Sequence, residues 1–151
     1  LRVIRELLVG EADGRGTNIA AAIDHLNRIT RRHAVVFIVS DFLDEGWETA
    51  LGIARRRHDV IPVRVVDPRE REMPDVGMVE VEDAETGDRM VIDTGSRTWR
   101  RAYADAARAR EERLTQSLRR LKLDSIDVVT GKPFVDPLIR FFREREARRS
   151  R

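Results

Sequence analysis

The apolar segment at residues 34–39 constrains the fold of this chain more than any other feature. It consists of Ala-Val-Val-Phe-Ile-Val without an intervening polar residue, and Ser40 and Asp41 follow it directly. Strands have this composition when helices cover both faces of a sheet, which is the usual state of parallel sheets. Burial of each such side chain contributes roughly 1.5 to 3 kcal/mol before entropy is subtracted. We therefore predict a strand in the middle of a parallel sheet.

Asp41 is the first candidate functional residue because it comes directly after this strand. Open α/β sheets bind their ligands at the carboxyl edge of the strands. The structural alternative is that Asp41 begins a turn or caps the next helix. Asp44 is a second possible cap, for a helix that begins near Trp47.

A threonine at the start of the preceding helix is the second candidate. Gly14 and Gly16 allow a tight turn before Thr17, and apolar side chains follow at helical spacing. As the N-cap of that helix, Thr17 would hold its hydroxyl in a fixed position. Hydroxyl and carboxylate oxygens are the kind of ligand that Mg²⁺ prefers in proteins. Thr17 and Asp41 together form a candidate metal site with part of its shell missing.

The rest of the chain continues an α/β pattern with one interruption. Helices are expected at residues 47–57, 96–121 and from 136 onward, and strands at residues 59–66 and 125–130. Pro62 cannot donate a ladder hydrogen bond, which favours a peripheral strand or an irregular start. Two short apolar runs around a turn predict a β-hairpin extension at residues 77–93. We predict an α/β fold with a doubly wound, mostly parallel sheet and flanking helices.

The length of the chain fits one domain that spans residues 1–151, since no low-complexity stretch divides these 151 residues. The first residue is Leu1, and a helix-like stretch at residues 3–8 opens the pattern. We therefore expect an N-terminally incomplete α/β domain. Without its first strands, the segment at residues 35–39 would expose an unpaired edge or a bare face, and we expect self-association or poor stability as a result.

The cysteine count and the hydropathy pattern limit the type of protein. There is no cysteine, which excludes disulfides, thiolate zinc sites and cysteine nucleophiles. No run approaches the roughly eighteen apolar residues that a membrane span needs, and no signal-peptide pattern opens the chain. We expect a cytoplasmic location and no membrane segment in this chain.

The charge pattern does not favour nucleic acid. The chain has 29 basic and 27 acidic residues, for a net charge of +2. Acidic residues interleave most of the arginine clusters, which is typical of solvated helix faces. Binding of nucleic acid by the arginine-rich tail at residues 143–151 is a weaker alternative, and we expect none.

The common sequence routes to catalysis are also missing. No glycine-rich phosphate loop, nucleophile elbow or HExxH motif occurs, and the three histidines have no partner at metal-binding spacing. We therefore expect a protein that is not an enzyme. The alternative is a magnesium-dependent hydrolase or phosphotransferase in which Asp41, Asp44 and Asp67 line a crevice. The structural alternative for Asp67 is a turn formed with Pro68.

Several short motifs together resemble one protein family. They are Gly16-Thr17, Ile38-Val39-Ser40-Asp41-Phe42, His58-Asp59-Val60-Ile61, Asp67-Pro68-Arg69-Glu70 with Met73-Pro74, the turn at residues 82–87, and Phe141-Phe142-Arg143. This combination resembles the bacterial domain-of-unknown-function family fifty-eight over residues 10–145. That family looks like a von Willebrand factor A-type domain associated with MoxR-type AAA+ ATPases, of which this chain would be the C-terminal part.

The resemblance implies a metal-ion-dependent adhesion site and a protein partner. In A-type domains, the ion is held by an Asp-x-Ser-x-Ser loop, a threonine and an aspartate, and here Thr17 matches the threonine and Asp41 the aspartate. The Asp-x-Ser-x-Ser loop does not occur in these residues, so we expect Mg²⁺ binding by this chain to be weak or absent. The implied function is a noncatalytic, metal-assisted protein-interaction module that acts as an adaptor or cofactor of a MoxR-type AAA+ ATPase.

Overall fold

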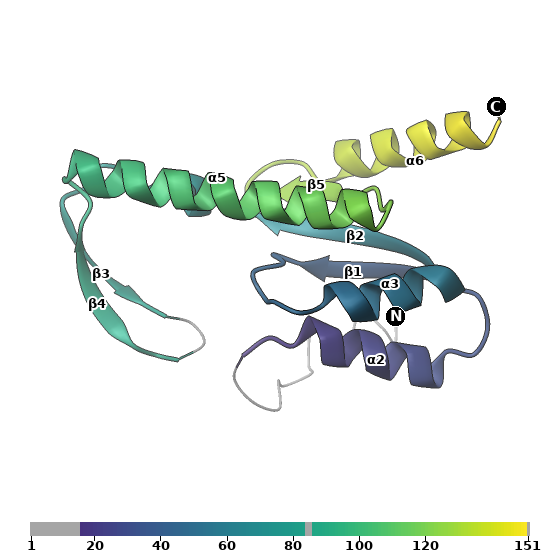
Figure 1. Ribbon diagram of the computed structural model, residues 1–151. Coiled ribbons are helices and arrows are strands. Elements are labelled where there is room, and N and C mark those ends of the chain that lie inside the picture. Colours follow the sequence, from purple (N-terminus) through teal and green to yellow (C-terminus); the bar gives the residue numbers. More distant parts are fainter. Residues whose placement is uncertain (1–15, 84–85, 151) are drawn as a thin grey trace, which may run out of the picture.

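Three parallel strands form the central sheet of the molecule, which we describe from a computed structural model at residues 16–83 and 86–150 (Figure 1). The strands are β1 (Val35–Ser40), β2 (Asp59–Val66) and β5 (Ile126–Val129), in the spatial order β1-β2-β5. The helices are α2 (Ile19–Ile29), α3 (Glu48–Arg57), α4 (Pro68–Arg71), α5 (Arg97–Arg120) and α6 (Val135–Arg149). The α/β class and the parallel sheet are confirmed. The helix-like stretch at residues 3–8 and Gly14 lie outside the described residues.

Helices lie on both faces of this sheet and form two hydrophobic cores. On one face, α2, α3 and the C-terminal part of α5 pack against the strands, with Leu51 and Ala54 completely buried. On the other face, α6 packs its Phe141 against Ile61 and Ile126. The helices and strands predicted from residue 17 onward all occur, and β2 has the bounds expected from the sequence.

Strand β1 differs from its prediction. Among the strands that the structure describes, it pairs only with β2, so it is an edge strand and not a central one. Its side chains alternate between half-buried and exposed, and Val35, Phe37 and Val39 are 56%, 49% and 64% exposed. The expected bare face is observed in part, because α6 packs mainly on β2 and β5 and reaches β1 through Phe142, whose ring lies 6.3 Å from that of Phe37.

Pro62 lies at the centre of the sheet, so the predicted peripheral position is wrong. It pairs with Ile38 of β1 in register and is almost fully buried. The Asp59 N–H donates to the Ala34 carbonyl at 2.9 Å, so the backbone N–H and C=O of Asp59 point toward β1. Backbone groups of successive residues point to opposite sides of a strand, so those of even-numbered residues of β2 point toward β5. The nitrogen of Pro62 therefore faces β5, where pairing begins only at Val63. No ladder bond is lost at this position.

The β-hairpin is confirmed as a separate two-stranded antiparallel sheet. It consists of β3 (Met78–Glu82) and β4 (Arg89–Asp93). Figure 1 shows it projecting from the N-terminal end of α5, away from the three-stranded sheet. The Ser96 hydroxyl accepts the Trp99 N–H at the start of α5, as the sequence predicts.

None of the helices that the structure describes is both long enough and apolar enough to cross a bilayer.

Candidate functional site

Asp41 follows β1 in a tight, internally bonded turn. Its Oδ1 atom accepts hydrogen bonds from the Ser40 hydroxyl at 3.3 Å and from the Leu43 N–H at 3.1 Å. Phe42 has a φ of +59° and packs its buried ring against Trp47 at 5.5 Å. The structural alternative for Asp41, a turn, is thus observed. The carboxylate is nevertheless exposed at the carboxyl edge.

Asp44 connects this turn to the start of α2. The prediction that it caps α3 is wrong, since Trp47 is the N-cap residue there and no side chain caps that helix. Instead, Asp44 Oδ2 accepts the Ile19 N–H at 2.7 Å, and the Asp44 carbonyl accepts the Trp47 indole N–H at 2.9 Å. Asp44 therefore satisfies a free N–H of α2 from a loop 25 residues away in sequence.

Thr17 is not the N-cap of α2, which corrects the second sequence prediction. Asn18 has this role, and its Oδ1 accepts the Ala21 N–H at 2.7 Å. Asparagine is at least as good a cap as threonine, so a shift by one residue costs nothing. Thr17 is exposed and lines a groove together with Ser40. The segments that carry Thr17 and Asp41 therefore adjoin, because the Asp44–Ile19 hydrogen bond joins their loops.

Asp67 ends β2 at the same edge and caps the short helix α4. Its Oδ1 accepts the Arg69 N–H at 2.8 Å, and Pro68 occupies the first helical position. Glu70, three residues further, was not singled out from the sequence. Burial and the negative charges of Asp41 and Asp67 raise the pKa of Glu70 above its ordinary value. The carboxylates of Asp41, Asp67 and Glu70 therefore lie close enough to repel one another.

A charge network fixes α5 beside this edge. Arg64 of β2, with a side chain only 11% exposed, binds Glu111 at 2.8 Å through Nη2 and also binds Asp127 of β5. Arg71 binds the same Glu111 oxygen at 2.7 Å. The hydrogen bond from Arg64 is the main reason that the pKa of Glu111 lies below its ordinary value. Arg64, Glu111 and Arg71 line a small pocket with Asp41 and Glu70.

The oxygen donors at this edge suit Mg²⁺ in kind but not in number. Within residues 16–83 and 86–150, no group of three or more histidine, aspartate or glutamate side chains is arranged to hold a metal ion. Thr17 and Asp41 would supply two ligands, whereas Mg²⁺ takes six oxygens and usually keeps several waters. The residues described here thus suit a partial metal shell.

Comparison with known proteins gives similarity at the level of sequence. The model of a family described as "Protein of unknown function DUF58" matches residues 1–113. Uncharacterized protein MAV169 of Mycobacterium avium is 34% identical over 131 residues, which cover 85% of this chain and 76% of that protein. Uncharacterized proteins of Mycobacterium bovis and Mycobacterium tuberculosis are 34% identical over 148 residues, or 96% of this chain. The chain spans only 45% of the length of these two relatives. No solved structure matches.

Proposed function

The chain belongs to the DUF58 family, and from this premise we propose that it is a noncatalytic, metal-assisted protein-interaction module with its binding site at the carboxyl edge of the sheet. The observation that carries the proposal is the hydrogen bond between Asp44 and the Ile19 N–H at 2.7 Å. It joins the loop that follows β1 to the start of α2, and these two segments contain Asp41 and Thr17. A hydroxyl and a carboxylate thus stand on adjoining segments at the end of a parallel sheet.

The role of the metal in this proposal is to present one open position to a partner. Thr17 and Asp41 would each hold the ion through one oxygen. The Ser40 and Leu43 hydrogen bonds occupy Asp41 Oδ1, so the other carboxylate oxygen is the one available to the ion. A carboxylate of the partner protein is the natural ligand for the open position, because Mg²⁺ prefers hard oxygen ligands.

Two acids of the alternative enzyme site have structural partners in this fold. Asp44 accepts the Ile19 N–H at the start of α2, and Asp67 caps α4, each through a backbone N–H bond of 2.8 Å or shorter. Both oxygens of Asp44 accept backbone N–H bonds, Oδ2 from Ile19 and Oδ1 from Glu45, so Asp44 is less available as a metal ligand than Asp41, whose bonds are to Oδ1 alone. This favours the interaction module over a magnesium-dependent hydrolase or phosphotransferase.

The kind of partner follows from the family resemblance. We propose that the chain is an adaptor or cofactor of a MoxR-type AAA+ ATPase in protein assembly or remodelling. Four basic residues of α5, Arg110, Arg113, Arg119 and Arg120, stand on the C-terminal part of that helix. Arg110, Arg113 and Arg120 line a pocket with the loop that follows Asp41. Asp44, Glu45 and Glu48 line the same pocket, so this surface offers a partner charges of both signs.

Metal titration tests the site itself. With Mn²⁺ as the probe, we expect saturable binding with a dissociation constant near 1 mM, which corresponds to about −4 kcal/mol. Asp41→Asn and Thr17→Val should each weaken it at least tenfold, whereas Asp136→Asn on α6 is the matched control and should have no effect. Equal binding by all variants would exclude Thr17 and Asp41 as ligands.

A binding assay tests the partner. A purified MoxR-type ATPase is immobilised, and binding of the chain is measured in Mg²⁺ and in EDTA. We expect binding that requires Mg²⁺ and is lost in Asp41→Asn. A phosphatase screen is run in parallel with the same variant. Magnesium-dependent turnover that Asp41→Asn abolishes would replace the interaction module with the alternative enzyme.

A further inference from the structure

The outer edge of the hairpin strand β3 carries backbone groups that pair with no strand in the described part of the chain. The Thr94 N–H donates to the Gly77 carbonyl at 2.8 Å, so these two residues form a hydrogen-bonded pair where the hairpin begins. Bonded and non-bonded pairs alternate along an antiparallel ladder. The N–H and C=O groups of the even-numbered residues of β3, Met78, Glu80 and Glu82, therefore point away from β4.

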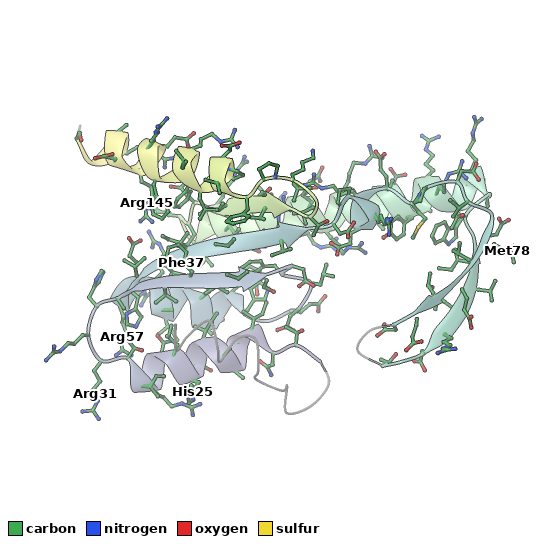
Figure 2. All side chains as sticks on the ribbon, turned by 180° about the vertical axis from the view of Figure 1, so that it is seen from behind. His25, Arg31, Phe37, Arg57, Met78 and Arg145 are labelled. Atoms are coloured by element: carbon green, nitrogen blue, oxygen red, sulfur yellow. The ribbon has the colours of Figure 1, made fainter. Side chains whose placement is uncertain are left out.

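This edge of β3 is open to solvent. Met78 is 68% exposed, and Glu80 and Glu82 are exposed as well. Figure 2 shows Met78 at the opposite end of the molecule from Arg57 and Arg145. An open edge of this kind is a template for a further strand.

The two faces of β3 differ in chemistry. Val79 and Val81 point to one face, where apolar residues of β4 lie opposite them in the ladder. Glu80 and Glu82 point to the other face, since successive side chains of a strand alternate. A strand added beside β3 would therefore meet apolar and acidic side chains in turn.

The hairpin is strongly acidic. Residues 76–94 contain six acidic side chains and a single basic one, that of Arg89. Arg89 forms an ion pair with Glu82 at 2.9 Å, but both side chains are more than half exposed, and exposed pairs contribute little. Glu80 has no ion-pair partner among the residues that the structure describes. A basic side chain brought to this edge would thus find an uncompensated carboxylate.

We propose that the free edge of β3 binds an extended segment of another protein as a third, antiparallel strand, and that basic and apolar residues alternate in this segment. Its basic side chains lie opposite Glu80 and Glu82, and its apolar side chains lie opposite Val79 and Val81. In this mode of recognition, backbone hydrogen bonds provide affinity and alternate side chains provide specificity. The proposal goes beyond the metal site and does not depend on it.

The chemistry of the edge selects a protein other than a second copy of this chain. Among the described strands, β1 and β5 contain no basic residue, β4 contains one, and β2 is already paired on both sides. Glu80 and Glu82 also repel a second copy of β3, because like charges directly opposite each other are unfavourable. Nucleic acids carry phosphates, which this acidic edge repels. The partner is therefore a protein with a basic, extended segment.

Fluorescence anisotropy with a labelled peptide in which lysine alternates with valine tests the proposal at physiological ionic strength. We expect saturable binding by the wild-type chain. A peptide of the same composition, with its lysines and valines in separate blocks, should bind at least tenfold more weakly. Glu80→Lys should weaken binding of the alternating peptide at least tenfold. Glu112→Lys is the matched control, because Glu112 is an exposed glutamate of α5, and it should change the dissociation constant by less than twofold.

Two further variants separate strand pairing from charge attraction. Glu80→Gln and Glu80→Pro both remove the carboxylate, but only proline removes an outward N–H, which the pairing of β3 with β4 does not use. Glu80→Pro should therefore bind the alternating peptide at least tenfold more weakly than Glu80→Gln. Circular dichroism verifies that each variant folds.

Amide hydrogen exchange of the wild-type chain gives an independent measurement. Exchange at Glu80 and Glu82 should slow when the alternating peptide is bound, because their N–H groups then donate to the added strand. Equal binding of the two peptides, a Glu112→Lys effect as large as that of Glu80→Lys, or exchange at Glu80 and Glu82 that the peptide leaves unchanged would each overturn the proposal.

Discussion

At the scale of the residue, hydrogen bonds from backbone N–H groups to three aspartate carboxylates stabilise the carboxyl edge of this sheet. Asp41, Asp44 and Asp67 each accept at least one backbone N–H bond between 2.7 and 3.1 Å. Two of these bonds stay within a few residues of the aspartate, but that of Asp44 spans 25 residues. Asp44 thus connects two elements, whereas Asp41 and Asp67 shape their own turns.

Removal of the Asp44 carboxylate should destabilise the whole chain. We expect Asp44→Ala to lower the free energy of unfolding by about 0.5–2 kcal/mol, the usual cost of a lost helix cap. Urea denaturation in dilute solution measures it, with Asp24→Ala on the exposed side of α2 as the control. Equal stability of the two variants would show that the bond between the Asp44 carboxylate and Ile19 is not stabilising.

Two glutamates near Arg64 should respond to pH with opposite signs. The pKa of Glu70 is raised above its ordinary value of 4.5, so folding favours its protonated form. The free energy of unfolding therefore falls as the pH rises from 4.5 through the folded-state pKa of Glu70. The pKa of Glu111 is lowered, so its contribution is present above 4.5 and is lost as pH falls through the folded value.

Glutamine substitutions measure the two signs directly. We expect Glu70→Gln to raise the unfolding midpoint slightly at pH 7, since this side chain is exposed, and Glu111→Gln to lower it. Both differences should shrink toward zero well below the ordinary pKa of 4.5. Thermal melts across this pH range provide the measurement, and two shifts of the same sign at pH 7 would contradict the assignment.

At the scale of the element, the two faces of β1 differ in how deeply they are buried. Val36 and Ile38 pack against the core beneath α2 and α3, whereas Val35, Phe37 and Val39 are exposed. These five side chains are equally apolar, so the sequence segment alone predicts burial for all of them. Helix α6 packs mainly on β2 and β5, and this position leaves the Val35, Phe37 and Val39 face of β1 largely exposed.

Alanine substitutions at two neighbouring positions of β1 should separate the faces. We expect Ile38→Ala to cost about 2 kcal/mol or more, because it leaves a cavity in the core. Val39→Ala should stay within about 0.5 kcal/mol, as is usual for surface positions. Both are measured by urea denaturation below the concentration at which the chain associates, and similar costs would mean that Val39 is covered in solution.

The hairpin is an independent part of the architecture at the scale of the whole molecule. Neither of the two hydrophobic cores of the described chain contains a residue of β3 or β4. The hairpin connects to the body through α5, and the buried Thr94 hydroxyl donates to the Gly77 carbonyl at 2.6 Å where its two strands meet. Its loss should therefore leave the sheet intact.

Excision of residues 78–93 tests this independence. The Thr94 N–H lies 2.8 Å from the Gly77 carbonyl, so an Asn-Gly turn can join these two residues. We expect the free energy of unfolding of the shortened chain to change by less than about 1 kcal/mol, because an isolated two-stranded hairpin is only marginally stable. A large loss of stability would show that the hairpin supports the cores.

The local elements of this protein were predictable from sequence because short-range physics determines them. Ser96 starts α5, the turn after Glu82 joins two short strands, and the apolar residues of β2 form a strand with the expected bounds. The position of Asp41 directly after β1, at the carboxyl edge of the sheet, was also predicted from the sequence. The sequence did not predict a role for Glu70, because only the position of α4 in the fold brings Glu70 near Asp41 and Asp67.

Apolar periodicity and capping residues in the sequence determined which segments are helices and strands, since those preferences act over a few residues. The tertiary structure decided the place of β1 at the edge of the described sheet, the tolerance of Pro62 at its centre and the hydrogen bond from the Ile19 N–H of α2 to Asp44. Each of these depends on which element lies beside another. Contacts between segments that are far apart in sequence determine that arrangement, and local residue preferences do not specify it.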